Sequence, residues 1–143
     1  MAKNRRKYII SEVKQIDAPN FTMNPVDLSK HFPNLKEFKV KRVYWVNNPK
    51  RSRETSHHAH KDEDGVFFFL KGSADLILDD GHGKEKFKLG ERNIVYIPRH
   101  VWHEIRNMSK DFILLVLSDK NYESSRKGYI ENYEDFKCTI NDK

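Results

Sequence analysis

The sequence predicts an all-β fold, a small antiparallel sandwich or barrel, from three observations. A chain of 143 residues has the length of one domain and can bury a sizeable core. Between residues 38 and 118, short period-two stretches rich in β-branched and aromatic residues recur, with turn signals roughly every 8 to 12 residues. The sequence DDGHG at 79–83 joins two of these stretches, and its glycines supply the positive φ angles that a hairpin loop needs.

The expected strands follow one another with breaks at asparagine, glycine or proline. The first begins at Phe38 and ends before the Asn-Asn-Pro sequence at 47–49, and a buried strand over 66–70 ends at Gly72. Pro98 interrupts the pattern where its missing N–H would break a ladder. In chain order, the expected strands cover residues 38–46, 55–61, 66–70, 74–78, 84–89, 93–97, 102–107 and 112–118.

The two ends of the chain differ from this pattern. Residues 1–37 contain three prolines and little periodicity, so we expect a lead-in strand near 8–13, irregular chain, and a short turn at 25–31. Residues 38–136 form the expected main domain. A short C-terminal helical segment that packs across the barrel is indicated by aromatic residues after Asp119, namely Tyr122, Tyr129, Tyr133 and Phe136. Residues 137–143 are expected to form a polar tail.

Composition and charge exclude several classes of protein. The net charge is +6, from 27 Lys and Arg against 21 Asp and Glu, and 12% of residues are aromatic, which excludes an acidic disordered chain. The basic residues are scattered among acidic ones, so we expect no nucleic-acid partner, whereas a small anionic ligand such as a nucleotide diphosphate fits this charge. Apolar runs fall far short of the roughly 18 to 20 residues of a transmembrane helix. The N-terminus lacks the apolar core of a signal peptide, so we expect no membrane association and a cytoplasmic location.

Strand parity makes two histidines informative, because residues two apart on a strand share one face. His58 and His60 therefore point the same way, and so do Arg42 and Tyr44 with the apolar residues Phe38, Val40 and Val46. Inward-facing arginine and histidine are costly to bury without a ligand or a polar network, which favours a ligand-binding face. The alternatives are that this face is exposed or that the histidines are a satisfied core pair. By the same parity His57 is expected to be solvated.

The spacing of these histidines resembles the cupin signature. In its first motif, His58-Ala-His60 is followed by Gly72, and the position of the carboxylate ligand falls on Gly65, so that ligand is missing. The second motif matches Gly90, Pro98, His103 and Asn107. His58, His60 and His103 can in principle form a three-imidazole metal site, but with the fourth ligand absent we expect no metal.

A closer resemblance covers roughly residues 38 to 136. Its motifs are the run 38–44, the His58-Ala-His60-Lys61 sequence, LKGS at 70–73, LDDG at 78–81, Pro98 before Trp102-His103-Glu104, LLVL at 114–117, and Tyr129-Ile130 with Phe136. Together these resemble the sugar 3,4-ketoisomerases that act on dTDP-4-keto-6-deoxyglucose. The resemblance implies a small homodimeric cupin that is cytoplasmic and metal-free. It also implies a dTDP-linked 4-keto-6-deoxy sugar as substrate, and a role in making deoxyamino sugars for lipopolysaccharide, S-layer or O-antigen glycans.

The resemblance also implies roles for particular residues. A 3,4-keto shift needs a base for the C3 proton, an acid that returns it to C4, and transfer of a proton between the two oxygens, with no redox cofactor. His58 corresponds to the carbon proton shuttle, and Tyr44 and His60 are candidates for the oxygen side. The residues expected to bind substrate are Arg42 or Arg99 at a phosphate or enediolate, Trp102 stacked on a ring, and His103 and Arg53. For single residues the alternatives remain a core tyrosine at Tyr44 and an ion pair between Arg42 and a nearby glutamate.

Three positions depart from the family pattern. Thr55-Ser56 stands where the family usually has Arg-Gly, Gly65 replaces a glutamine, and Glu131 replaces an arginine. These departures identify a divergent member and leave open the C4 stereochemistry of the product, the nucleotide base and the pathway. The alternatives are a sugar-nucleotide 3,5-epimerase, which uses similar chemistry on a related fold, and a non-catalytic cupin that binds a sugar nucleotide or a metal.

Overall fold

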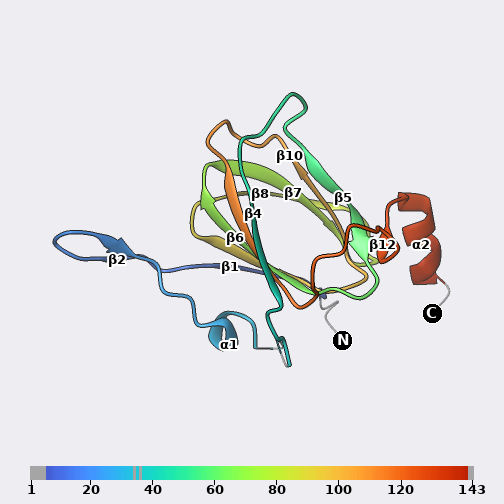
Figure 1. Ribbon diagram of the computed structural model, residues 1–143, viewed down its shortest axis with the longest axis horizontal. Helices are drawn as coiled ribbons and strands as arrows, with labels where there is room; N and C mark the ends of the chain where they lie inside the picture. The colour runs from blue at the N-terminus through green and yellow to red at the C-terminus, as the bar shows by residue number, and fades with distance from the viewer. Residues whose placement is uncertain (1–5, 34, 36, 142–143) are drawn as a thin grey trace.

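Two five-stranded antiparallel sheets form the body of the protein, as the computed structural model, which describes residues 6–33, 35 and 37–141, shows (Figure 1). The first sheet has the order β1-β9-β6-β11-β4, and the second has the order β12-β5-β10-β7-β8. The elements are β1 (Ile9–Glu12), β2 (Ile16–Asp17), β3 (Thr22–Met23), α1 (Leu28–His31), β4 (Arg42–Val46), β5 (Thr55–His60), β6 (Gly65–Lys71), β7 (Ser73–Asp79), β8 (Glu85–Gly90), β9 (Asn93–Ile97), β10 (Trp102–Arg106), β11 (Ile113–Ser118), β12 (Tyr129–Ile130) and α2 (Tyr133–Asn141). The predicted all-β sandwich is confirmed.

The core lies between the two sheets because each central strand turns alternate side chains inward. On β11, Leu114 and Val116 are buried while their neighbours are half exposed, and on β7 the buried residues include Leu76 and Leu78. Side chains from both sheets meet in one apolar cluster, to which Tyr44 and Val46 of β4 are packed from the side. The predicted period-two alternation therefore sets which residues face the interior.

The hairpin between β7 and β8 forms at the predicted glycines. Gly81 and Gly83 have φ angles of 110° and 97°, which residues with a Cβ rarely adopt. The Asp79 carboxylate accepts hydrogen bonds from both backbone N–H groups, at 2.8 and 3.1 Å. Backbone freedom and side-chain capping thus act together in this turn.

Strand β4 is shorter than expected at its start. It begins at Arg42, opposite Ser118, the last residue of its partner β11, and the Lys41 N–H makes a final 2.8 Å hydrogen bond to the Ser118 carbonyl oxygen. Val40, expected to face the core, is therefore 46% exposed. Phe38 packs instead against a second apolar cluster, outside the space between the sheets, that includes Val13 and Phe32.

Both chain ends take part in the sandwich more fully than the expected boundaries suggest. The lead-in strand β1 pairs with β9, so residues assigned to a segment before position 38 form one edge of the first sheet. Helix α2 continues through Asn141 because Phe136 and Ile140 pack on the outer face of the second sheet, so most of the expected polar tail is helical. Residues 142–143 of that tail lie outside the described part of the chain. No helix in the described ranges has the length and apolar character to span a membrane.

Candidate active site

The predicted histidine face points into the sandwich and lines a cavity of about 110 Å³. Strand β5 supplies His58 and His60, and β10 supplies His103, which lies directly opposite His58. Tyr44 reaches the cavity from β4 of the other sheet. The remaining lining residues are Val46, Thr55, Ser56, Phe67, Ile105, Leu114 and Tyr129. A small set of polar groups is therefore held in an otherwise apolar pocket, as is typical of small-molecule sites.

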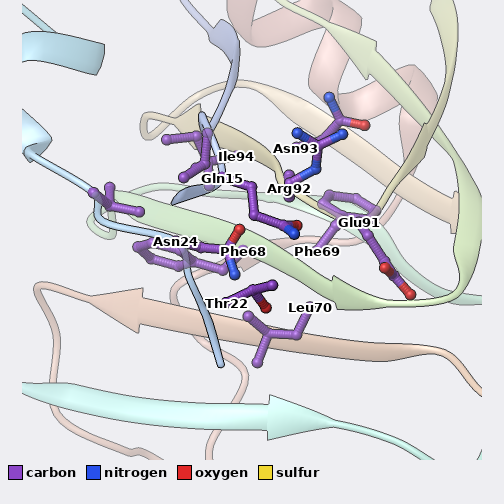
Figure 2. A pocket seen from close by; sticks show the side chains of 12 residues that line it. Gln15, Thr22, Asn24, Phe68, Phe69, Leu70, Glu91, Arg92, Asn93 and Ile94 are labelled. Carbon is purple, nitrogen blue, oxygen red and sulfur yellow. The ribbon is translucent and has the colours of Figure 1, made fainter. Parts of the chain in front are cut away.

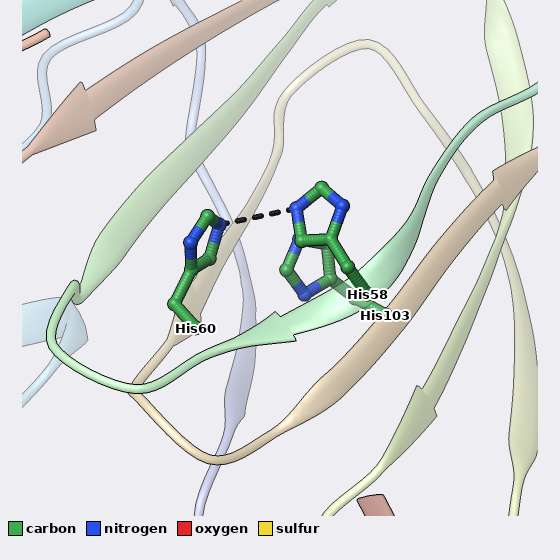
Figure 3. A group of neighbouring side chains, drawn as sticks. All are labelled: His58, His60 and His103. Carbon is green, nitrogen blue, oxygen red and sulfur yellow. Dashed lines mark hydrogen bonds between the residues drawn. The ribbon is translucent and has the colours of Figure 1, made fainter. Parts of the chain in front are cut away.

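The three imidazoles lie against one another (Figure 3). His58 Nε2 and His60 Nε2 are 3.1 Å apart, and His58 Nδ1 is 2.9 Å from the carbonyl oxygen of Ser56. A carbonyl oxygen only accepts hydrogen bonds, so His58 carries its proton on Nδ1 and its Nε2 bears the lone pair. His60 is consequently the donor, through Nε2–H, in the bond between the two rings. This assignment leaves His58 Nε2 as the proton-accepting atom of the site.

The ionisable groups of the cavity include both a potential general base and a potential general acid. Burial, with a smaller contribution from the neighbouring imidazoles, lowers the pKa of each of the three histidines to about 3. These rings are therefore neutral at physiological pH. Burial, together with the nearby Glu63 carboxylate, raises the pKa of Tyr44, so its phenol keeps its proton. Neutral imidazole and protonated phenol are the forms that general base and general acid catalysis require.

Glu63 is a buried carboxylate at this site that sequence reasoning missed. Its side chain is 5% exposed, and its Oε2 accepts a hydrogen bond of 2.8 Å from Arg42. Its Oε1 lies 3.7 Å from His60 Nδ1. The cupin spacing placed the expected carboxylate position at Gly65, but the turn between β5 and β6 brings an acid two positions earlier to the histidines. The available signal for Glu63 was the presence of acidic residues in the loop that follows His58-Ala-His60.

Arg42 is engaged within the protein instead of pointing freely into the cavity. Besides its ion pair with Glu63, its guanidinium lies over the ring of Tyr44, 4.9 Å from the centroid. The alternative considered for this residue, an ion pair with a nearby glutamate, is the arrangement observed. Arg42 therefore acts on the site by fixing Glu63 and Tyr44.

Tyr129 is a second lining residue that was not assigned to the site. Strand β12 pairs with β5 and places Tyr129 opposite His60. Its ring centroid lies 4.6 Å from those of both His58 and His60. The family motif included Tyr129, but only the pairing of β12 with β5, distant in sequence, shows that it closes the histidine cluster.

Three residues expected to bind substrate do not line the cavity. Arg99 pairs with Asp64 and Asp119, at 3.1 Å each. Arg53 lies in an exposed turn before β5. Trp102 precedes His103 on β10 and so points to the opposite, outer face. There it is 3% exposed and packs on Tyr133 and Phe136 of α2.

Replacing Trp102 with phenylalanine is expected to weaken folding and leave substrate binding intact. The indole donates a 2.7 Å hydrogen bond to the buried Glu104, and losing that bond and some packing should cost about 1 to 3 kcal/mol of unfolding free energy. KM for a sugar nucleotide, the substrate that the family resemblance implies, should stay within about twofold, because no contact with the cavity is removed. Urea unfolding and steady-state kinetics measure the two effects. A large rise in KM with unchanged stability would place Trp102 in the binding site after all.

The three histidines are also the described residues best arranged to hold a metal. Their ligand atoms all lie within 4.8 Å of one another. The carboxylate that would complete a four-ligand set, Glu63, is hydrogen-bonded by Arg42. Moreover, the lone pair of His58 Nε2 accepts a hydrogen bond from His60, an arrangement suited to a proton-transfer site.

Comparison with known proteins places this geometry in a family. The family model described as FdtA, WxcM-like, C-terminal matches residues 6–141. The chain belongs to the FdtA family. A relative of this FdtA-family chain from Aneurinibacillus thermoaerophilus, named TDP-4-oxo-6-deoxy-alpha-D-glucose-3,4-oxoisomerase, is 32% identical over 133 residues, which cover 92% of this chain and 91% of the relative.

Solved structures agree with the family assignment. The TDP-fucose-3,4-ketoisomerase WlaRA from Campylobacter jejuni is 30% identical, with a TM-score of 0.78 and coverage of 96% of this chain and 98% of that one. The TDP-quinovose 3,4-ketoisomerase WlaRB from the same species is 30% identical, with a TM-score of 0.79 and coverage of 94% and 99%. The resemblance drawn from the motifs is therefore confirmed, as is the fold that it implies.

Proposed function

We propose that this FdtA-family protein is an isomerase that moves the keto group of a TDP-linked 4-keto-6-deoxy sugar from C4 to C3. The observation that carries the proposal is the pairing, across one cavity, of a neutral His58 whose Nε2 lone pair faces inward with a protonated Tyr44. The names of the relatives support the same reaction and the same class of substrate.

The proposed reaction relocates a carbonyl without any external oxidant. His58 Nε2 takes the proton from C3 while Tyr44, or His60 through its Nε2–H, gives a proton to O4, which produces an enediol. His58 then returns its proton to C4 as the O3 hydroxyl gives up its proton to the depleted oxygen-side group, so that the carbonyl forms at C3. All groups regain their starting protonation, and the substrate and product are isomers.

Burial of His58 favours the second proton transfer of this reaction, from His58 to C4. An imidazole with a pKa of about 3 is a weak base but becomes a strong acid once charged, so it readily delivers the proton to C4. The partial negative charge that develops on O4 in the transition state, before its protonation is complete, lies near the imidazolium and stabilises it, because an opposite charge nearby favours the charged form. The reacting sugar thus raises the basicity of His58 at the step that needs it.

The size of the cavity limits what enters it. A volume of about 110 Å³ is well below the roughly 300 to 1,000 Å³ of pockets that enclose a whole drug-sized ligand. The reacting part of the sugar is therefore proposed to enter, with the diphosphate and base outside. Arg53, exposed shortly before the lining residue Thr55, is the proposed diphosphate contact, with His103 at the sugar. Arg99 and Trp102 are not proposed as substrate contacts, because Arg99 pairs with Asp64 and Asp119 and Trp102 packs on α2.

Product analysis in deuterated water tests the proposed reaction. The protein is incubated with dTDP-4-keto-6-deoxyglucose, and the sugar is followed by proton and carbon NMR. We expect a 3-keto product, with deuterium confined to C3 of the substrate and C4 of the product. Exchange at C5 would instead indicate a 3,5-epimerase, and saturable binding without exchange would indicate a binding protein.

We also propose that the protein is a homodimer that associates through the outer face of its first sheet. Trp45, Leu115 and Phe68 lie side by side across β4, β11 and β6 on that face. Trp45 is 63% exposed, an unusual position for a large apolar side chain. Val43 and Leu70 extend the exposed apolar surface.

The projecting arm formed by β2 and β3 supports the proposal that a second copy covers this face. Strands of two residues do not form a stable hairpin alone, and the arm projects from the sandwich (Figure 1). Its apolar residues Ile16, Phe21 and Met23 are exposed. Between the arm and the first sheet lies a cavity of about 210 Å³, with Thr22 and Asn24 on one side and Phe68 on the other (Figure 2). A partner arm and sheet would bury both surfaces, and a shared patch of this kind suits a twofold dimer.

Replacing Trp45 with glutamate is expected to convert the dimer to a monomer. A charge at the centre of an apolar interface has no partner and is costly to bury. Light scattering at micromolar concentration should give twice the chain mass of 17.0 kDa for the native protein and that mass for the variant. Tyr122→Glu, at a residue 75% exposed outside this face, is the control and should remain dimeric. A native protein that scatters as a monomer would contradict the proposal.

The proposed setting follows from the family resemblance. A cytoplasmic ketoisomerase of this kind would supply 3-keto sugar nucleotides, which an aminotransferase converts to deoxyamino sugars for surface glycans such as lipopolysaccharide O-antigen.

A further inference from the structure

Strand β5 contains an extra residue immediately before the proposed proton shuttle. Across the ladder with β10, His103 lies opposite His58, but the next residue, Glu104, lies opposite Ser56, so His57 forms a β-bulge. Ser56 and His57 have φ angles of 76° and 57°. Residues with a side chain seldom adopt this region, and two in succession persist only where surrounding contacts hold them. His57 lies on the same outer face as Glu104, as strand parity predicted, but beside two acids instead of in open solvent.

Two carboxylates flank the His57 ring at ion-pair distance, and its buried Nε2 makes no hydrogen bond with the described residues. Its Nδ1 lies 3.5 Å from Glu104 Oε1, and its Nε2 lies 3.4 Å from Glu54 Oε1. The side chain is only 34% exposed. Arg106 also bridges the two acids, at 2.9 Å to Glu104 and 3.3 Å to Glu54. The bulge is thereby tied to β10, the strand that carries His103.

Glu104 is a fixed anion in this arrangement. It is 2% exposed, and it accepts hydrogen bonds from Trp102 at 2.7 Å and Arg106 at 2.9 Å and pairs with Lys84 at 2.9 Å. Burial alone would raise the pKa of Glu104, but these donors outweigh it and lower the pKa to about 2. The proposed isomerisation does not use the Glu104 carboxylate. Proton transfer therefore does not explain why so many side chains bind it.

The bulge determines the hydrogen bonding of His58. Because the chain turns at Ser56 and His57, the Ser56 carbonyl comes within 2.9 Å of His58 Nδ1. That bond is the one that places the proton on Nδ1 and leaves the lone pair on Nε2, where it accepts the hydrogen bond from His60. At His103, where β10 has no extra residue, the distance from Nδ1 to the carbonyl oxygen two residues earlier is longer, 3.3 Å.

We propose that His57 is a positioning residue for the isomerisation, which clamps the bulge between Glu54 and Glu104 so that the Ser56 carbonyl holds His58 in its Nδ1–H tautomer. The role of His57 in turnover rests on the proposed function, whereas the tautomer of His58 does not. His57 touches no cavity, and it acts on the reaction only through His58.

Two substitutions separate the clamp from the backbone conformation. Glycine adopts positive φ without strain, so His57→Gly keeps the bulge accessible but removes the ring between the acids. Asparagine also tolerates positive φ, and its amide can donate to Glu104, so His57→Asn restores part of the clamp. Arg92→Gly is the matched control, because Arg92 has a φ of 72° in the turn before β9 and does not line the histidine cavity. Steady-state kinetics and nitrogen-detected NMR of the histidine side chains are measured for each protein.

We expect His57→Gly to lower kcat by about tenfold with KM nearly unchanged, since a displaced catalytic group loses rate more than binding. His57→Asn should recover most of that loss, and Arg92→Gly should match the native enzyme. His58 should carry its proton on Nδ1 in the native protein and show a tautomer mixture in His57→Gly. A native His58 protonated on Nε2, or a His57→Gly protein with native kcat and tautomer, would overturn the proposal. The tautomer result stands even if no ketoisomerase activity is found, so the two proposals fail separately.

Discussion

Replacing His58 with asparagine is expected to abolish isomerisation while leaving sugar-nucleotide affinity within a few-fold of the native value. His58 is the imidazole whose Nε2 lone pair faces the other cavity groups, and its role is confined to the transition state of proton transfer. Removing a sole carbon acid/base should therefore lower kcat on the order of 10² or more. Contacts to the diphosphate and base, which lie outside the small cavity, remain.

The measurement follows both turnover and isotope exchange. Deuterium from solvent should enter the sugar at C3 or C4 with the native protein and not with His58→Asn, and calorimetry should give similar binding of the dTDP sugar. His31→Asn is a matched histidine control, because His31 lies on α1, does not line the cavity, and has its ring hydrogen-bonded to Ser11 at 2.8 Å. Normal turnover by His58→Asn would make His58 structural and transfer the shuttle role to His60.

The fold could be predicted from the sequence wherever a local pattern determines the structure. Alternation on β11 and the glycines at 81 and 83 each fix a strand face or a turn within a few residues, and the structure agrees with them. The same parity brought His58, His60 and Tyr44 together from two strands. These predictions succeed because side-chain direction on a regular strand depends only on spacing.

The sequence analysis failed where backbone irregularity or long-range pairing sets direction. His57 lies on the outer face that parity assigned to it, but two acids stand beside it instead of open solvent. Glu63 was overlooked because a carboxylate was sought at a fixed spacing, while the turn after β5 presents a different residue. Tyr129 closes the cluster only because β12 pairs with β5, a contact without a local signal. Each miss concerns the conformation of a connection, which composition and periodicity do not determine.

Replacing Glu63 with alanine is expected to lower both stability and turnover. The change would leave the Arg42 guanidinium, whose side chain is 17% exposed, without its carboxylate partner. Breaking a buried ion pair from one side typically costs about 3 to 5 kcal/mol, and partial exposure of Arg42 places the expected loss near about 3 kcal/mol. Because Arg42 also supports the Tyr44 ring, and Glu63 faces His60, kcat should fall by about tenfold.

A double substitution separates these two effects. Arg42→Met with Glu63→Leu removes both charges and fills the space with apolar groups, an exchange that is often neutral or stabilising for a buried pair. Urea unfolding should therefore show most of the lost stability restored. Turnover should stay low, since neither Tyr44 nor His60 regains its charged neighbour. If the double variant instead turns over like the native enzyme, the Arg42–Glu63 pair serves folding alone and His60 is oriented by its bond to His58.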